Sequence, residues 1–139
     1  MRFFAMLLVT VALAGCSATP ATRESSPVPN ATVNSPIEFL LTSCATDFQT
    51  HSPHPARFRD VRTGYIMSPD GKRQDILCGE FSPAGEGGKV EWVPFITIKT
   101  SGYEQMLGDS AASLCKRSSV VWEKEDFSSS LQSRFDSLR

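Results

Sequence analysis

Residues 58–81, FRDVRTGYIMSPDGKRQDILCGEF, decide the fold of this chain. Residues 58–67 are rich in β-branched and aromatic side chains, which favour a strand. The Ser-Pro-Asp-Gly sequence at 68–71 predicts a turn, so residues 74–81 return as a second, antiparallel strand. Gly64 is expected to mark a bulge in the first strand.

Two further strands are predicted after this hairpin. Residues 89–100 follow a glycine-rich turn and are predicted to form the longest strand, which extends the hairpin into a three-strand meander. Pro94 within this run favours an edge position or a kink. Val120 and Trp122 indicate a short fourth strand over residues 119–124.

Helices are predicted before and after the meander. Ser35 and Pro36 suit the N-cap and first position of a helix that ends near residue 49. Its apolar face consists of Ile37, Leu40, Leu41, Cys44 and Phe48. Further helices are predicted over residues 103–116 and 127–138. The sequence therefore predicts an α+β domain over residues 36–139, a small antiparallel sheet (three-strand meander plus one short strand) with helices packed on one face.

The first fifteen residues have the layout of a secretory signal peptide, because Arg2 precedes an apolar run too short for a permanent membrane helix. The run ends in Leu-Ala-Gly-Cys at 13–16, which resembles the lipobox of bacterial lipoproteins at all four positions. The resemblance implies that diacylglycerol is attached to the Cys16 sulfur, that cleavage precedes Cys16, and that the new amine is acylated. Ordinary cleavage with a free Cys16 is the alternative, since residues 12–14 fit a small-x-small site.

The residues after Cys16 indicate in which membrane the protein is anchored and how the domain is attached to it. In the lipoprotein sorting rule Asp at the next position favours the inner membrane, so Ser17 implies the outer membrane, with the domain facing the periplasm. Residues 16–35 contain the lipidated cysteine and a stretch rich in Ser, Thr, Ala and Pro, which we interpret as a flexible spacer. The remaining residues, about a hundred, suffice for one domain with one core.

The charge of the chain is nearly balanced, with 14 Lys and Arg against 15 Asp and Glu residues. This balance provides no basic field, so no nucleic-acid partner is expected. Arg57, Arg59 and Arg62 lie close in sequence, but Asp60 interrupts them. We interpret this segment as a solvated face of a strand.

Three cysteines, Cys44, Cys78 and Cys115, remain once Cys16 carries lipid. Disulfides persist in the oxidising periplasm, and the pairs 44–78, 44–115 and 78–115 are all open, because sequence alone does not choose rigorously. The local environments favour 78–115. Cys44 lies on the buried helical face, where a free thiol behaves as a small hydrophobe, whereas the other two end a strand and a helix.

Two further motifs carry a resemblance to a group of proteins. HPARFRDV at 54–61 and CGEF at 78–81, followed by a glycine-rich turn and an aromatic strand, resemble small uncharacterised exported proteobacterial proteins with a Pro-x-x-Phe-Arg-x-Val segment, a Cys-Gly-Glu strand and a late cysteine. The resemblance covers about residues 36–122. It implies the same fold and the 78–115 pairing, and it brings no activity.

The titratable residues offer few candidates for a catalytic or metal site. His51 and His54 with a cysteine suggest a metal site or a nucleophilic pair, but a His-x-x-His in a proline-rich loop lacks the helical geometry of common zinc sites, and a nucleophilic thiol must be partly exposed. Glu80, Glu91 and Glu104 are scattered as ordinary surface acids. No catalytic residue, metal ligand or cofactor is therefore expected.

The aromatic residues Trp92, Phe95, Tyr103 and Trp122 are expected mostly in the core of so small a domain. One of them left exposed would be a candidate contact for a partner protein or glycan.

The sequence leaves three functions open and does not define the oligomeric state. The first is a non-enzymatic outer-membrane lipoprotein, held at the membrane through Cys16, whose domain binds or stabilises another envelope component. The second is a small periplasmic hydrolase or cell-wall enzyme with His54 beside a free cysteine or paired acids. The third is an accessory lipoprotein of a secretion or transport assembly, cross-linked to a partner by an unpaired cysteine.

The lipid anchor is directly testable. Cys16→Ser should abolish incorporation of a fatty-acid analogue in growing cells, because only a thiol forms the thioether and no other cysteine adjoins the leader. Label retained by this variant would contradict the assignment of Cys16 as the anchor.

Overall fold

The computed structural model describes residues 35–85, 87 and 89–139. The expected signal peptide, Cys16 and nearly all of the spacer lie outside these residues. The elements in chain order are α1 (Pro36–Thr50), β1 (Pro55–Met67), β2 (Arg73–Pro83), β3 (Val93–Lys99), β4 (Tyr103–Leu107), α2 (Asp109–Cys115), β5 (Val121–Asp126) and α3 (Ser128–Ser137). None of the helices in the described ranges is long and apolar enough to cross a membrane.

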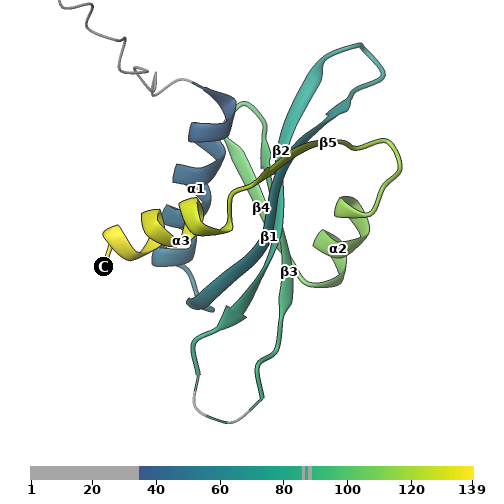
Figure 1. Ribbon diagram of the computed structural model, residues 1–139. Coiled ribbons are helices and arrows are strands. Elements are labelled where there is room, and N and C mark those ends of the chain that lie inside the picture. The colour runs from purple at the N-terminus through teal and green to yellow at the C-terminus, as the bar shows by residue number, and fades with distance from the viewer. Residues whose placement is uncertain (1–34, 86, 88) are drawn as a thin grey trace, which may run out of the picture. The chain divides into compact units, whose positions relative to one another are not determined.

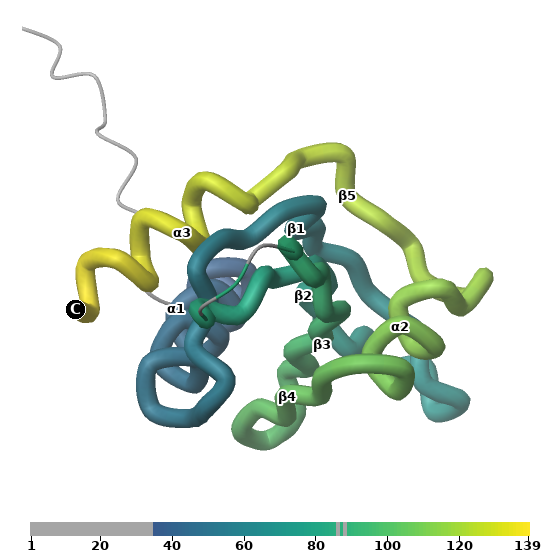
Figure 2. Tube along the Cα trace, turned by 90° about the horizontal axis from the view of Figure 1, so that it is seen from below, coloured from purple at the N-terminus to yellow at the C-terminus, as the bar shows by residue number. Residues whose placement is uncertain are grey.

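The five strands form one antiparallel sheet in the order β4-β3-β2-β1-β5. Helices α1 and α3 cover one face of the sheet, and α2 covers the other (Figures 1 and 2). The predicted α+β class with an antiparallel sheet is confirmed. The structure adds a fifth strand and differs from the expectation of helices on one face, because α2 lies on the opposite face from α1 and α3.

The face under α1 and α3 holds an aromatic core. Ser35 caps α1 as predicted, since its hydroxyl oxygen accepts a hydrogen bond of 3.1 Å from the backbone N–H of Glu38. The helix then buries the apolar side chains of its inner face against β1, β2 and β3. Five phenylalanine rings meet there, with neighbouring centroids 4.8 to 6.4 Å apart. These rings are Phe48, Phe58, Phe81, Phe95 and Phe135.

The other face has a second, smaller core. Successive strand residues point to opposite faces, so Leu77 of β2 packs under α1 whereas Ile76 and Cys78 pack on the α2 side. Ile96 of β3, Ala111 of α2 and Val120 before β5 complete this second cluster. β2 therefore carries apolar side chains on both of its faces. A single layer of helices would leave one of these faces open to water.

The region after β3 differs from the sequence prediction. A helix was expected over residues 103–116, but Tyr103–Leu107 forms the edge strand β4, paired with β3. Gly108, with φ of 71°, then reverses the chain into the short helix α2. The apolar residues at 106 and 107 fit the spacing of a helix as well as that of a strand. Hydrogen bonding to the free edge of β3 decides in favour of a strand.

Two local irregularities also differ from expectation. Pro94 lies in an inner strand, but at its start, before the pairing of β3 with β4 begins at Phe95. The register of β1 against β2 shifts between Pro55 and Arg57 and again between Arg59 and Arg62, rather than at Gly64. The second shift is the bulge that matters for the site. Against β5, a shift occurs between Arg62 and Gly64. Asp60 in this bulge adopts the left-handed region, with φ of 52°.

The packing of Phe95 yields a prediction on stability. A Cβ atom on Gly79 would lie 2.8 Å from the Phe95 ring and 2.9 Å from a Val61 methyl group. We expect Gly79→Ala to lower the free energy of unfolding by about 1–3 kcal/mol through overpacking. Urea unfolding of the purified proteins measures it, with Gly102→Ala as control because a Cβ there meets no atom within 4 Å. Equal losses in both variants would contradict this role of Gly79.

Candidate functional site

A pocket of about 300 Å³ opens on the α2 face of the sheet, and we call it the α2-side pocket. Residues 78–80 of β2 form its floor. Ala112 and Lys116 on and just after α2 form one wall, and Trp122 of β5 and Pro94 of β3 lie on other sides. Residues from separate parts of the chain therefore converge on one hollow, which is the usual form of a small-molecule site.

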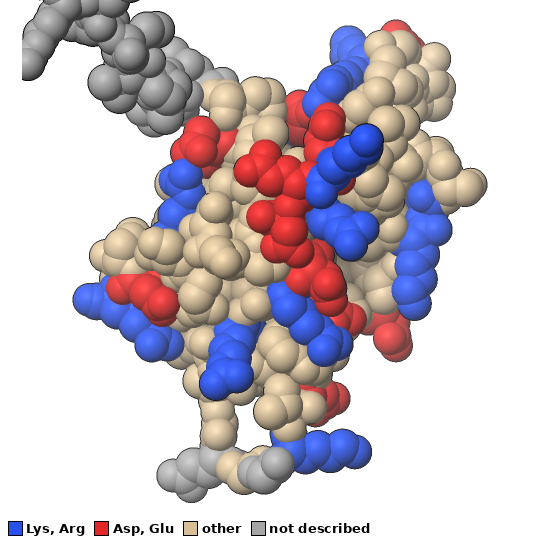
Figure 3. Space-filling view, in the orientation of Figure 1, with Lys and Arg blue, Asp and Glu red and all other residues tan. Residues whose placement is uncertain are grey.

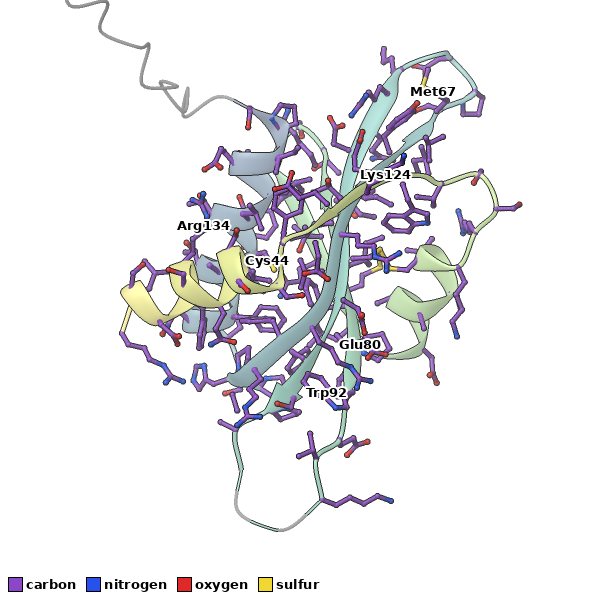
Figure 4. The ribbon with its side chains drawn as sticks, in the orientation of Figure 1. Cys44, Met67, Glu80, Trp92, Lys124 and Arg134 are labelled. Carbon is purple, nitrogen blue, oxygen red and sulfur yellow. A yellow bond between two sulfur atoms is a disulfide. The ribbon has the colours of Figure 1, made fainter. Side chains whose placement is uncertain are left out.

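The disulfide between Cys78 and Cys115 fixes the wall of this pocket. Their Cα atoms are 6.1 Å apart, and 37 positions separate them in sequence. The structure thus contains the pairing that the local environments favoured. Figure 4 shows the two sulfur atoms between the sheet and α2. Closing a loop of this length contributes about 4 kcal/mol in the chain-entropy model, and it ties the short helix to the pocket floor.

Arg59 organises the acidic side of the pocket. Its guanidinium group donates to the Glu80 carboxylate, with Nη2 at 2.5 Å and Nε at 2.6 Å from the same oxygen. Its Nε also lies 3.6 Å from a carboxylate oxygen of Asp60. The group stacks over the Trp92 ring at 4.1 Å, near the labelled Glu80 in Figure 4. These exposed pairs add little stability, but they hold Glu80 in one orientation.

The bulge in β1 gives Asp60 and Arg62 their places on the pocket. Bulges redirect side chains, and aspartate tolerates the left-handed conformation better than most residues. The bulge is held from the opposite face, because Val61 N–H donates to the Ser128 hydroxyl (3.1 Å) and Phe127 N–H donates to the Val61 carbonyl (2.7 Å).

The two cations of the pocket come from different elements. Neither Arg62 of β1 nor Lys116, which follows α2, forms an ion pair within 4.0 Å inside the described ranges. Asp126 is the cross-strand neighbour of Arg62, and it accepts a 2.8 Å hydrogen bond from Ser128 N–H. Hydrogen bonds from Ser128, with a smaller contribution from the charge of Arg62, lower the pKa of Asp126. This carboxylate is therefore occupied at the start of α3.

The two histidines and the free thiol do not lie together in one site. His51 lies beside Asp47 at 3.2 Å, and His54 Nδ1 lies 2.9 Å from the Phe48 carbonyl oxygen, both in exposed positions. Cys44 is unpaired and fully buried on the α1 face. Burial raises its pKa to about 12. No three His, Cys, Asp or Glu residues of the described chain are grouped to hold a metal ion.

Only some of the acidic and aromatic residues considered from the sequence line the α2-side pocket. Of the three glutamates considered, Glu80 lines the pocket. Trp122 lines it too, whereas Phe95 is fully buried under α1. Tyr103, expected in the core, is 36% exposed on the edge strand. Its hydroxyl donates to Asp47 at 2.7 Å, and this hydrogen bond is the main cause that raises the pKa of Tyr103 to about 12.

Sequence reasoning missed Asp60, Arg62 and Lys116 as members of one site. The arginine cluster around Asp60 was interpreted as a solvated face, and nothing in the local sequence shows that a bulge turns it toward α2. The positive φ of Asp60 is visible only in the structure. The spacing of Cys78 and Glu80 was the available signal, because alternate strand residues share a face with each other.

The burial of Cys44 predicts its reactivity. In the Cys16→Ser protein, iodoacetamide at pH 9 should modify no cysteine in the folded state and only Cys44 after unfolding in urea, as read by mass spectrometry. Reduction should be required before Cys78 and Cys115 react. Because burial raises the pKa of Cys44 from 9.0 to about 12, the contribution of this thiol to stability is complete below pH 9 and declines as the pH rises toward 12. Rapid labelling of Cys78 in the folded protein would contradict the assignment.

Comparison of the chain with models of protein families, with curated proteins and with solved structures finds no match.

Proposed function

We propose that the protein is a lipoprotein of the bacterial envelope, anchored through lipid on Cys16 to the outer membrane with its domain in the periplasm. The domain binds another envelope component in the α2-side pocket and catalyses no reaction. The lipobox-like sequence at 13–16 supports the anchor. The disulfide supports an oxidising compartment, because such bonds persist in the periplasm and are rare in the cytosol.

The observation that carries the binding function is the way the pocket is prearranged. The disulfide holds α2 against β2, and Arg59 holds the Glu80 carboxylate. A site whose groups are fixed before the ligand arrives loses less conformational entropy on binding. Trp122 is only partly buried at this pocket, and a tryptophan that retains exposed surface beside polar groups is a frequent anchor for partners.

The same geometry favours binding over hydrolysis. Both acids of the pocket are ion-paired with Arg59, so they act as oriented hydrogen-bond acceptors. A thiol nucleophile must be accessible and easily ionised, but Cys44 is buried on the opposite face of the sheet with a raised pKa. Neither the hydrolase alternative nor cross-linking through an unpaired cysteine gains a specific observation from the described residues.

Site-directed photocross-linking in intact cells tests this function. A photoreactive lysine analogue that keeps the ammonium group, placed at position 116 on the rim of the pocket, should give an ultraviolet-dependent adduct. The same side chain at Ser133, exposed on α3, is the control and should give none. Arg62→Ala should reduce the adduct formed from position 116, because Arg62 lines the same pocket.

Two results would contradict the proposal. One is the absence of any adduct from position 116, and the other is an equal yield of the same adduct from positions 116 and 133. The first would show that the pocket meets no partner in cells, and the second would show unspecific contact.

A further inference from the structure

Charge balance is the first feature that identifies the ligand of the α2-side pocket. Asp60 and Glu80 oppose Arg62 and Lys116 on its lining, and the neighbouring Arg59 and Asp126 add one charge of each sign. Figure 3 shows a band of acidic side chains down the middle of this view of the molecule, with basic side chains on both sides of it. A site for phosphate or carboxylate concentrates Arg and Lys, so the pocket selects neither an anion nor a cation.

The charged side chains of the pocket disfavour a lipid chain. Four charged side chains lie on its lining, from β1, β2 and the end of α2. An acyl chain bound there would displace water from these groups without offering them hydrogen bonds, which is energetically unfavourable. A polar, uncharged ligand therefore fits this lining better than an acyl chain does.

The strand order argues against a peptide bound through its backbone. The pocket floor is formed by β2, which lies between β1 and β3. Backbone groups of such an inner strand are already used in the sheet, whereas a bound peptide strand pairs with a free edge. Side chains, rather than the backbone, must supply the hydrogen bonds to the ligand.

The wall of the pocket offers one partly exposed aromatic surface. The indole of Trp122 lies against Gly64 of β1, where a Cβ atom would be only 2.9 Å from the ring. Because Gly64 has no side chain, the indole packs directly against the backbone of β1. The disulfide and Pro94 continue the apolar surface beside it.

We propose that the α2-side pocket binds a neutral sugar unit of an envelope glycan; this inference rests on the proposed function. Sugar hydroxyls both donate and accept hydrogen bonds, so adjacent hydroxyls match a lining in which carboxylates accept and Arg62 and Lys116 donate. The C–H face of the sugar ring packs on the indole of Trp122. A single ligand class thereby satisfies the charge balance, the polarity and the aromatic wall.

Fluorescence titration of the full lipidated chain in a detergent without sugar groups tests this proposal. The chain contains two tryptophans, so Trp92→Phe leaves Trp122 as the only indole reporter. The probes are three neutral tetrasaccharides, namely chitotetraose, maltotetraose and cellotetraose, with a galacturonic acid tetramer and a glucosamine tetramer as the anionic and cationic comparisons. We expect saturable binding of a neutral probe at least about tenfold tighter than that of either charged one.

A pair of lysine variants locates the binding. Lys116→Ala should weaken binding of the neutral probe about tenfold, because a hydrogen bond from a charged donor is lost. Lys124→Ala removes the same group from β5 outside the α2-side pocket (Figure 4) and should leave the affinity unchanged. Both changes are at exposed positions, so neither should disturb folding.

The outcomes separate this inference from the proposed function. If no neutral tetrasaccharide binds, if a charged one binds more tightly, or if both lysine variants bind as the parent does, the sugar assignment is overturned. A pocket-specific cross-link from position 116 would still support binding of an envelope component of another class. Loss of that cross-link as well would overturn both proposals.

Discussion

β2 carries apolar side chains toward both faces of the sheet, and this constraint shapes the whole domain. Leu77 and Phe81 enter the aromatic core under α1, whereas Ile76 and Cys78 face α2. At about 25 cal/mol per Å² of apolar surface buried, neither face can be left open to water. The chain covers the first face with two helices and the second with one short helix that a disulfide retains. The α2-side pocket exists because this short helix covers only part of its face.

The local sequence predicts elements whose signals are confined to a few neighbouring residues. The hairpin of β1 and β2 follows from the turn chemistry at 68–71, and α1 follows from the Ser35 cap and its apolar period. β4 could not be predicted in this way. Met106 and Leu107 suit a helix as well as a strand, and the hydrogen bonds that decide between them come from β3, which contributes no signal to that segment.

The candidate site was less predictable than the fold because it depends on one extra residue in β1. Residues three apart in a regular strand face opposite sides, yet Phe58 and Val61 both enter the core under α1. Correspondingly, Arg59 reaches Glu80 and Arg62 lines the same pocket. The bulge at Asp60 reverses which side of the sheet each following residue faces. An interpretation of the sequence that assumes regular alternation therefore places Arg59 and Arg62 on opposite faces, whereas the structure brings them to the same face.

The bulge also connects the two faces of the sheet. On the α3 side, Val61 is fixed by hydrogen bonds to Phe127 and Ser128 at the start of that helix. On the α2 side, the same few residues place Asp60 and Arg62 around the pocket. The packing of α3, which is far in sequence from β1 and does not line the pocket, therefore sets the positions of two of its four charged side chains. The conformation of a strained residue persists only where its surroundings determine it, and here those surroundings are the core on the opposite face.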